Sequence, residues 1–167
     1  PFFHIRGVIR LVLFTIWSVL VVPPQILVLS IYRGQGAYII PQIWHKGVCL
    51  IMGLRITWHG QPETRYQTLF VSNHISYLDI PALGSRLRAS FVAKSEVSKW
   101  PVFGFLSRLQ QTAFINRART DTAVSRDSLK SKLEQNKSLI LFPEGTSSNG
   151  NSILPFRSSF FALAEGA

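Results

Sequence analysis

A histidine and an aspartate five residues apart are the side chains in this sequence best suited to acid–base chemistry. His74 follows the short apolar segment 69–72, and Asp79 comes soon after it. A neutral imidazole can take a proton from a hydroxyl near pH 7, because its ordinary pKa is about 6.5. A carboxylate at the other ring nitrogen would fix the tautomer and stabilise the imidazolium. The pair requires His74 in a turn and Asp79 in the first turn of a helix; the alternative is that Asp79 only stabilises that helix.

Polar residues follow three of the apolar segments that we predict as strands. Asn73-His74 follows 69–72, Asn116-Arg117 follows Thr112–Ile115, and the run from Pro143 to Thr146 follows Ser138–Phe142. In α/β sheets, functional sites form beyond the carboxyl ends of the strands. We therefore expect a base, a guanidinium and a tight glycine turn to meet at one edge of a sheet.

Each of these polar residues has a functional and a simpler interpretation. Arg117 could bind a phosphate through two parallel N–H bonds, or it could be a solvated charge. In the Glu144-Gly145-Thr146 turn, Glu144 could hydrogen-bond a hydroxyl or an arginine, and Gly145 could let substrate approach the backbone. The alternative is a plain turn after a strand. Lys94 could add positive charge to the same edge, although solvent exposure explains it more simply.

The sequence argues against a covalent enzyme intermediate and against a metal site. It contains no Gly-x-Ser-x-Gly nucleophile motif, and Cys49, its one cysteine, lies far along the chain from the other candidates. No zinc-ligand spacing is present. Direct transfer fits better, with His74 deprotonating a hydroxyl that attacks an activated carbonyl. A thiolate with a pKa near 8.5 leaves with little help, so a thioester donor suits such a site.

Composition indicates a membrane protein with anionic partners. Hydrophobic residues make up 47% of the 167 residues, and charged residues make up 16%, below the roughly 25% of soluble domains. The net charge of +10 favours phosphate groups or acidic lipid. Nucleic acid is disfavoured, because most aromatic residues lie in apolar runs and no RNP-like strand is present.

The N-terminal region is predicted to contact the membrane. Leu11–Tyr32 carries no charged side chain and as one helix would be about 33 Å long, close to the hydrocarbon thickness of a bilayer. Pro23-Pro24 interrupts it, so we expect two short helices that enter one leaflet and turn back, in preference to one kinked span or a signal peptide. Ile39–Gly53 is predicted as an amphipathic helix, packed either on the membrane or in a core. Its apolar face would carry Ile40, Ile43, Trp44, Val48 and Ile51, and its polar face Gln42, His45 and Lys46.

Short apolar strands alternating with helices predict an α/β fold with a mixed, partly parallel sheet flanked by helices, behind the membrane-embedded helical segment. We expect residues 1–53 to anchor the chain and residues 54–167 to form the α/β domain. The chain begins with Pro1 and has no visible stop signal, so we expect a fragment that is incomplete at its C-terminus. The predicted strands are Arg55–His59, Leu69–Ser72, Ser90–Ala93, Thr112–Ile115 and Ser138–Phe142, and the predicted helices span 96–109 and 121–135.

These residues resemble the blocks of the glycerolipid acyltransferase family, most closely its lysophosphatidic acid acyltransferases. The first block, Asn-His-x4-Asp, is matched by Asn73-His74 and Asp79, and the second by Phe114-Ile115-Asn116-Arg117. The third is matched by the run from Phe142 to Thr146. Further similar positions are Lys94-Ser95-Glu96, Pro101, Gly104, Gly150 and Leu154-Pro155-Phe156-Arg157. Many members carry arginine where this chain has Ser147, and the fourth block would lie beyond Ala167.

The resemblance implies acyl transfer from acyl-CoA or acyl-carrier protein to a lysophospholipid hydroxyl, without a further cofactor. His74 would be the base and Asp79 its partner. Arg117 would bind the acceptor's phosphate, and Glu144, Gly145 and Thr146 would shape that site. The leading expectation is a 1-acylglycerol-3-phosphate acyltransferase on the cytoplasmic face of the bacterial inner membrane. The alternatives are an enzyme for another lyso-lipid, such as lyso-ornithine lipid, and a non-catalytic, membrane-tethered lipid-binding domain.

Overall fold

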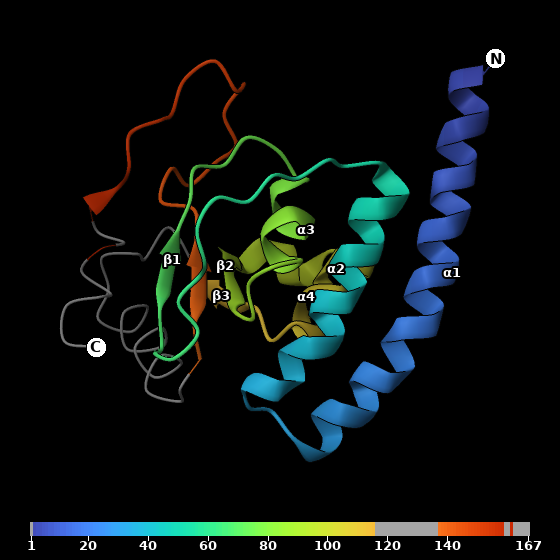
Figure 1. The fold of residues 1–167 in the computed structure, drawn as a ribbon, viewed down its shortest axis with the longest axis horizontal. Helices are drawn as coiled ribbons and strands as arrows, with labels where there is room; N and C mark the ends of the chain where they lie inside the picture. The colour runs from blue at the N-terminus through green and yellow to red at the C-terminus, as the bar shows by residue number, and fades with distance from the viewer. Residues whose placement is uncertain (1, 116–136, 159–160, 162–167) are drawn as a thin grey trace. The chain divides into compact units, whose positions relative to one another are not determined.

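The structure, a computed structural model, describes residues 2–115, 137–158 and 161 (Figure 1). The predicted helix 121–135 and the candidate Arg117 lie outside the described residues. The chain divides into two compact units. The first comprises residues 1–62 and 77–88, and the second comprises residues 63–76 and 89–167.

In the first unit, one continuous helix α1 (Phe2–Ile31) contains both prolines. The expectation of two short helices within this segment is therefore wrong. One face of the helix carries a stripe of buried and half-buried side chains that continues past Pro23-Pro24, whereas the two prolines themselves are exposed. The stripe keeps helical spacing, so the prolines lie where they disturb no contact. It consists of Phe14, Trp17, Ser18, Val21, Val22, Gln25, Val28 and Leu29.

Helix α2 (Ile39–Met52) lies beside α1 and runs in the opposite direction (Figure 1). A short 3₁₀ helix, η1 (Gln35–Tyr38), joins the two. On one side of the prolines the indole N–H of Trp17 donates to the carbonyl of Trp44 at 3.0 Å. On the other side the amide of Gln25 donates to the carbonyl of Ala37 at 3.1 Å. Contacts on both sides of Pro23-Pro24 hold α1 as one element.

The predicted helix 39–53 is present, and it ends at Gly53 in the left-handed conformation with φ 73°. The predicted assignment of its faces is partly wrong, because His45 is buried and Ile43 is exposed. The imidazole of His45 packs against Gly84, so closely that a Cβ on that glycine would lie 2.4 Å from the ring. An imidazole enclosed in this way behaves as a core side chain, which a polarity pattern alone does not reveal.

Helix α3 (Asp79–Gly84) and the residues after it pack on the buried face of α2. The amide of Gln42 donates to the carbonyl of Arg86 at 2.8 Å, and its oxygen accepts from Nε of Arg88 at 3.2 Å. One turn further, His45 covers Gly84. Polar and apolar contacts along this face therefore fix α3 to the helix pair.

The predicted strand Arg55–His59 is absent from the described structure, where this segment belongs to no helix or strand. All of its side chains are exposed. Alternating polarity predicts a strand only where one face becomes buried and a neighbour supplies hydrogen bonds. Neither condition is met here, so this expectation is wrong.

In the second unit, the described residues form a four-stranded sheet with the order β1-β4-β2-β3. All of its pairings are parallel, which confirms the α/β class and replaces the expected mixed sheet with a parallel one. The central strands β2 and β4 are buried, as expected for a parallel sheet. Four of the predicted strands are therefore confirmed to within two residues. Their bounds are β1 Leu69–Val71, β2 Ser90–Lys94, β3 Ala113–Ile115 and β4 Leu139–Leu141.

The predicted helix 96–109 is divided into the 3₁₀ helix η2 (Ser95–Lys99) and the α-helix α4 (Pro101–Leu109). The division falls at Trp100, whose backbone is extended. Proline disfavours helical dihedrals in the residue before it but is well suited to the first helical position. Pro101 therefore ends the first helix and begins the second.

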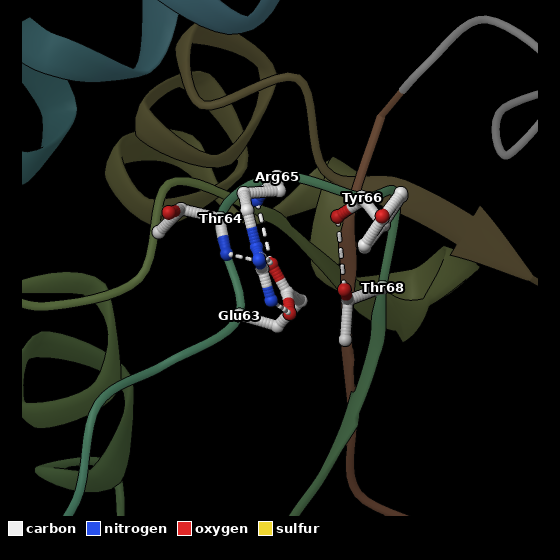
Figure 2. Close-up of polar contacts among 5 residues, drawn as sticks. All are labelled: Glu63, Thr64, Arg65, Tyr66 and Thr68. Atoms are coloured by element: carbon white, nitrogen blue, oxygen red, sulfur yellow. Dashed lines mark hydrogen bonds and ion pairs between the residues drawn. The ribbon is translucent and has the colours of Figure 1, made fainter.

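The turn that leads into β1 is organised by one carboxylate (Figure 2). Glu63 accepts the main-chain N–H groups of Thr64 at 2.9 Å and Arg65 at 2.7 Å, and it forms an ion pair with the Arg65 guanidinium at 3.4 Å. The bond from the Arg65 main chain lowers the pKa of Glu63, because it stabilises the ionised carboxylate. The hydroxyl of Thr68 then donates to the carbonyl of Tyr66 at 2.9 Å, next to the start of the strand.

Candidate active site

The candidate site lies at the carboxyl ends of β1 and β4, which are neighbours in the sheet (Figure 1). Their register pairs Val71 with Leu141, and the N–H of Ser72 continues the ladder to the carbonyl of Leu141 at 3.1 Å. Because the two strands are parallel, the residues that follow them emerge at the same edge. These are His74 after β1 and Glu144 after β4.

His74 is held by contacts from the chain that follows β4. Its main-chain N–H donates to Oε1 of Glu144 at 3.2 Å, and its carbonyl accepts from the N–H of Ser148 at 2.8 Å. Its ring stacks on Phe142, with the ring centres 4.2 Å apart and an interplanar angle of 24°. Phe142 in turn stacks on Phe91 of β2 at 6.2 Å. The imidazole therefore lies on an aromatic support anchored in the sheet, and it remains partly exposed.

Glu144 is an ionisable side chain with only 4% of its surface exposed. Its Oε1 binds His74, whereas its buried Oε2 has no hydrogen-bond partner among the described residues. Leaving a buried carboxylate oxygen unpaired is costly. Oε2 is therefore available for a donor such as a hydroxyl or a guanidinium, which are the partners that the sequence analysis predicted for it.

Gly145 turns the chain directly after Glu144. Its φ of 76° is in the left-handed region, which glycine adopts without strain. Its N–H donates to the carbonyl of Phe142 at 3.1 Å, and the next residue in the chain, Thr146, is exposed. The turn is closed from the other side by the N–H of Arg157, which donates to the carbonyl of Pro143 at 3.2 Å.

The remaining candidates lie at different places in the fold. Asp79 is the first residue of α3 and belongs to the first unit, whereas His74 belongs to the loop after β1 in the second unit. Asp79 lies in the first turn of a helix, as the predicted pairing requires, and the pairing itself stays a prediction. Lys94 ends β2 with an exposed side chain, and its role at the site stays a prediction. Arg117 lies outside the described residues.

Two contributors to this site were given no role in the sequence analysis. Phe142 supports the imidazole, and the main chain of Ser148 fixes the His74 carbonyl. An aromatic residue directly before Pro143-Glu144 was a signal for the first, whereas nothing in the sequence marks the second. Within the described part of the chain, no group of three or more histidine, cysteine, aspartate or glutamate residues is arranged to hold a metal ion.

Comparison with known proteins agrees with this arrangement. The chain is 38% identical to a lyso-ornithine lipid O-acyltransferase of Rhizobium meliloti, over 90% of this chain and 51% of that protein. It is 36% identical to a 1-acyl-sn-glycerol-3-phosphate acyltransferase of Neisseria gonorrhoeae, over 62% of this chain and 41% of that protein. The chain thus spans about half the length of the relatives that it matches.

A solved structure is similar in fold. It is the 1-acyl-sn-glycerophosphate (LPA) acyltransferase PlsC from Thermotoga maritima, with a TM-score of 0.72 and 18% identity, over 96% of this chain and 69% of that one. Residues 55–167 match the family model named Acyltransferase. Since that match covers well over half of the sequence, the chain belongs to the acyltransferase family.

Proposed function

We propose that the protein transfers a fatty acyl group from an acyl thioester to the hydroxyl of a lyso-lipid. The observation that carries the proposal is the imidazole of His74, fixed at the end of β1 beside the buried Glu144 carboxylate. Family membership supports the same reaction, because relatives of both kinds named above are acyltransferases. No cofactor is required beyond the donor, either acyl-CoA or acyl-carrier protein.

The reaction needs one base and a good leaving group. His74 takes the proton of the acceptor hydroxyl as its oxygen attacks the thioester carbonyl carbon. Collapse of the tetrahedral intermediate breaks the C–S bond, and the leaving thiolate takes a proton from the imidazolium or from water. Asp79 would orient the imidazole, as the family resemblance implies. Such a base contributes about 10²–10⁴-fold to the rate.

Lyso-ornithine lipid is the acceptor that we favour. The Rhizobium meliloti relative with that name matches more of this chain, at 38% identity over 90% of it, than the Neisseria 1-acyl-sn-glycerol-3-phosphate acyltransferase does, at 36% over 62%. Ser147 adds a physical reason, since it stands where many family members carry an arginine. An acceptor without a phosphate needs fewer cations at the site. Lysophosphatidic acid, bound through Arg117, is the second candidate.

We also propose that the protein works at the cytoplasmic face of the bacterial inner membrane. By length and composition, α1 has one segment, His4–Ile31, that is apolar enough to cross a bilayer. Arg6 and Arg10 precede the uncharged run Leu11–Tyr32 and Arg33 follows it, as expected for a segment next to anionic lipid. Acyl thioesters would reach the site from the aqueous side.

A competition assay tests the proposed function. The full-length protein, reconstituted in lipid, is given an acyl thioester and an equal mixture of lyso-ornithine lipid and lysophosphatidic acid, and products are identified by mass spectrometry. We expect diacylated ornithine lipid as the main product. Phosphatidic acid as the main product would reverse the choice of acceptor, and lipid binding without any acylated product would favour the non-catalytic alternative.

A further inference from the structure

Helix α4 of the second unit exposes three of its large apolar side chains, while Leu106 and Leu109 are half-buried. Val102 is 57% exposed, Phe103 56% and Phe105 41%, and Trp100 at the start of the helix is 44% exposed. In the helix itself Gly104 is the buried residue. Contiguous apolar surface of this kind marks an interaction site more often than it occurs by accident.

The way in which α4 is attached explains this exposure. Gly104 lies so close to η2 that a Cβ there would be 2.4 Å from the carbonyl oxygen of Ser98. Arg108 adds a hydrogen bond from its guanidinium to the same oxygen at 3.0 Å. Gly104 therefore packs directly against η2. This contact leaves Trp100, Val102, Phe103 and Phe105 exposed.

Basic residues lie on both sides of these apolar residues in the sequence. Lys94, Lys99 and Arg108 are exposed, and Glu96 is the one acidic residue between positions 94 and 109. We call Trp100, Val102, Phe103 and Phe105, together with Lys99 and Arg108, the α4 surface. Its combination of protruding aromatic groups and cations is complementary to anionic lipid, in which apolar side chains enter the acyl boundary and cations meet the headgroups.

We propose that the α4 surface inserts into the headgroup region of an anionic bilayer and gives the second unit a membrane contact separate from α1. A bilayer fits better than an acidic protein, because the exposed side chains are mainly large and apolar, and acyl chains can cover them without a matching partner surface. Tryptophan and phenylalanine beside lysine and arginine are typical of interfacial helices. The contact does not depend on which acceptor is acylated.

The test uses the full-length protein in vesicles, with Cys49→Ala and one new cysteine carrying an environment-sensitive fluorophore. The label is placed at Val102 or, as the control, at the exposed Arg65 before β1. Nitroxide-labelled lipid is the quencher, in phosphatidylcholine vesicles with or without phosphatidylglycerol. We expect quenching at Val102 to be several-fold stronger than at Arg65, and to increase with phosphatidylglycerol. Lys99→Gln should weaken that increase, and Phe105→Cys provides a second labelling position if Val102→Cys folds poorly.

Three results would overturn the proposal. Equal quenching at positions 102 and 65 would show that α4 has no special contact with lipid. A label at Val102 that responds to added acyl-carrier protein and not to quencher lipid would replace the bilayer with a protein partner. A cysteine at 102 or 105 that does not react in the folded protein would mean that other parts of the chain cover α4. None of these measurements requires turnover, so their outcome is separate from that of the acylation assay.

Discussion

The main-chain N–H of His74 donates to Oε1 of Glu144, which lies 70 residues further along the chain, at a distance of 3.2 Å. The bond joins the loop after β1 to the turn after β4 at one edge of the parallel sheet. It uses one carboxylate oxygen of Glu144 and leaves the other for a different donor. The predicted base therefore owes its position to the same residue that was predicted to bind substrate.

Replacement of Glu144 separates these two roles. Glu144→Ala removes the acceptor of the His74 N–H, and an unsatisfied buried group costs about 1–3 kcal/mol. Glu144→Gln keeps an oxygen for that bond, so we expect its free energy of unfolding to change by less than about 1 kcal/mol. Both variants should lose acyl transfer, because the carboxylate is gone. Denaturant unfolding in detergent measures the stability, and turnover of lyso-lipid measures the acyl transfer. Equal stability of Glu144→Ala and Glu144→Gln would show that the bond from the His74 N–H to Glu144 contributes nothing to stability.

His74→Ala removes the base while leaving the bond to Glu144, since the donor is the main chain. We expect transfer to fall by about 10²–10⁴-fold with the fold intact. His74→Phe is the matched control, because it retains a ring to stack on Phe142. It should be as inactive as His74→Ala and at least as stable. Turnover by either variant at the wild-type rate would remove His74 from the mechanism.

Asp79→Asn tests the predicted partner of His74. The amide keeps the size of the side chain at the start of α3 but removes its charge. If Asp79 stabilises the imidazolium, kcat falls strongly and the acceptor KM changes little, because the interaction grows in the transition state. A variant with unchanged kcat and lower stability would instead assign Asp79 to the helix N-terminus alone.

The strands could be predicted because each is a short apolar run between polar residues. Leu139–Leu141 is the clearest case, since all three side chains are buried, as in the centre of a parallel sheet. The bond between His74 and Glu144 could not be predicted. It depends on β4 pairing with β1, whereas sequence alone does not indicate the order of strands, which here is β1-β4-β2-β3.

The N-terminal helices show where local rules fail. Pro23 and Pro24 predict a break, because proline in a helix interior costs roughly 3 kcal/mol. In α1 both prolines face outward, while the stripe through Trp17 and Gln25 keeps its contacts with the following helix. Packing thus outweighs intrinsic preference. His45 shows the same limit, since its ring is buried against Gly84, a contact that the local sequence does not reveal.

Gly145→Ala and Gly60→Ala are a matched pair. Both glycines have positive φ, 76° and 78°, so a Cβ at either position adds strain of about 1–2 kcal/mol. Gly60 has open space around it and lies in an exposed loop. We expect similar losses of stability and a loss of acyl transfer only for Gly145→Ala. Equal activity of the two variants would show that the turn after Glu144 does not shape the site.

Gly84→Ala tests the attachment of α3 to α2. The new methyl group would overlap the buried ring of His45, and such overpacking costs about 1–3 kcal/mol. Gly7→Ala in α1 is the control, because nothing lies within 4 Å of its added Cβ. It should be neutral or stabilising by about 0.5–1 kcal/mol. Unfolding in detergent compares the free energies of unfolding of the two variants. Equal values would mean that the ring of His45 can move aside for the new methyl group without loss of stability.

Burial raises the pKa of the Cys49 thiol on α2, and a hydrogen bond with Ser85 offsets part of this effect. The folded protein therefore keeps the thiol proton at a pH where the unfolded chain, with an ordinary pKa near 8.5, has begun to lose it. The stabilising contribution is complete below about pH 8.5 and is lost as the pH rises through the higher pKa of the folded state. Wild type should lose stability relative to Cys49→Ala above that pH, and maleimide should label Cys49 more slowly in the folded protein than in the denatured chain, because the thiol is buried. Parallel stability curves for wild type and Cys49→Ala, together with labelling as fast as in the denatured chain, would show that the thiol is not shielded.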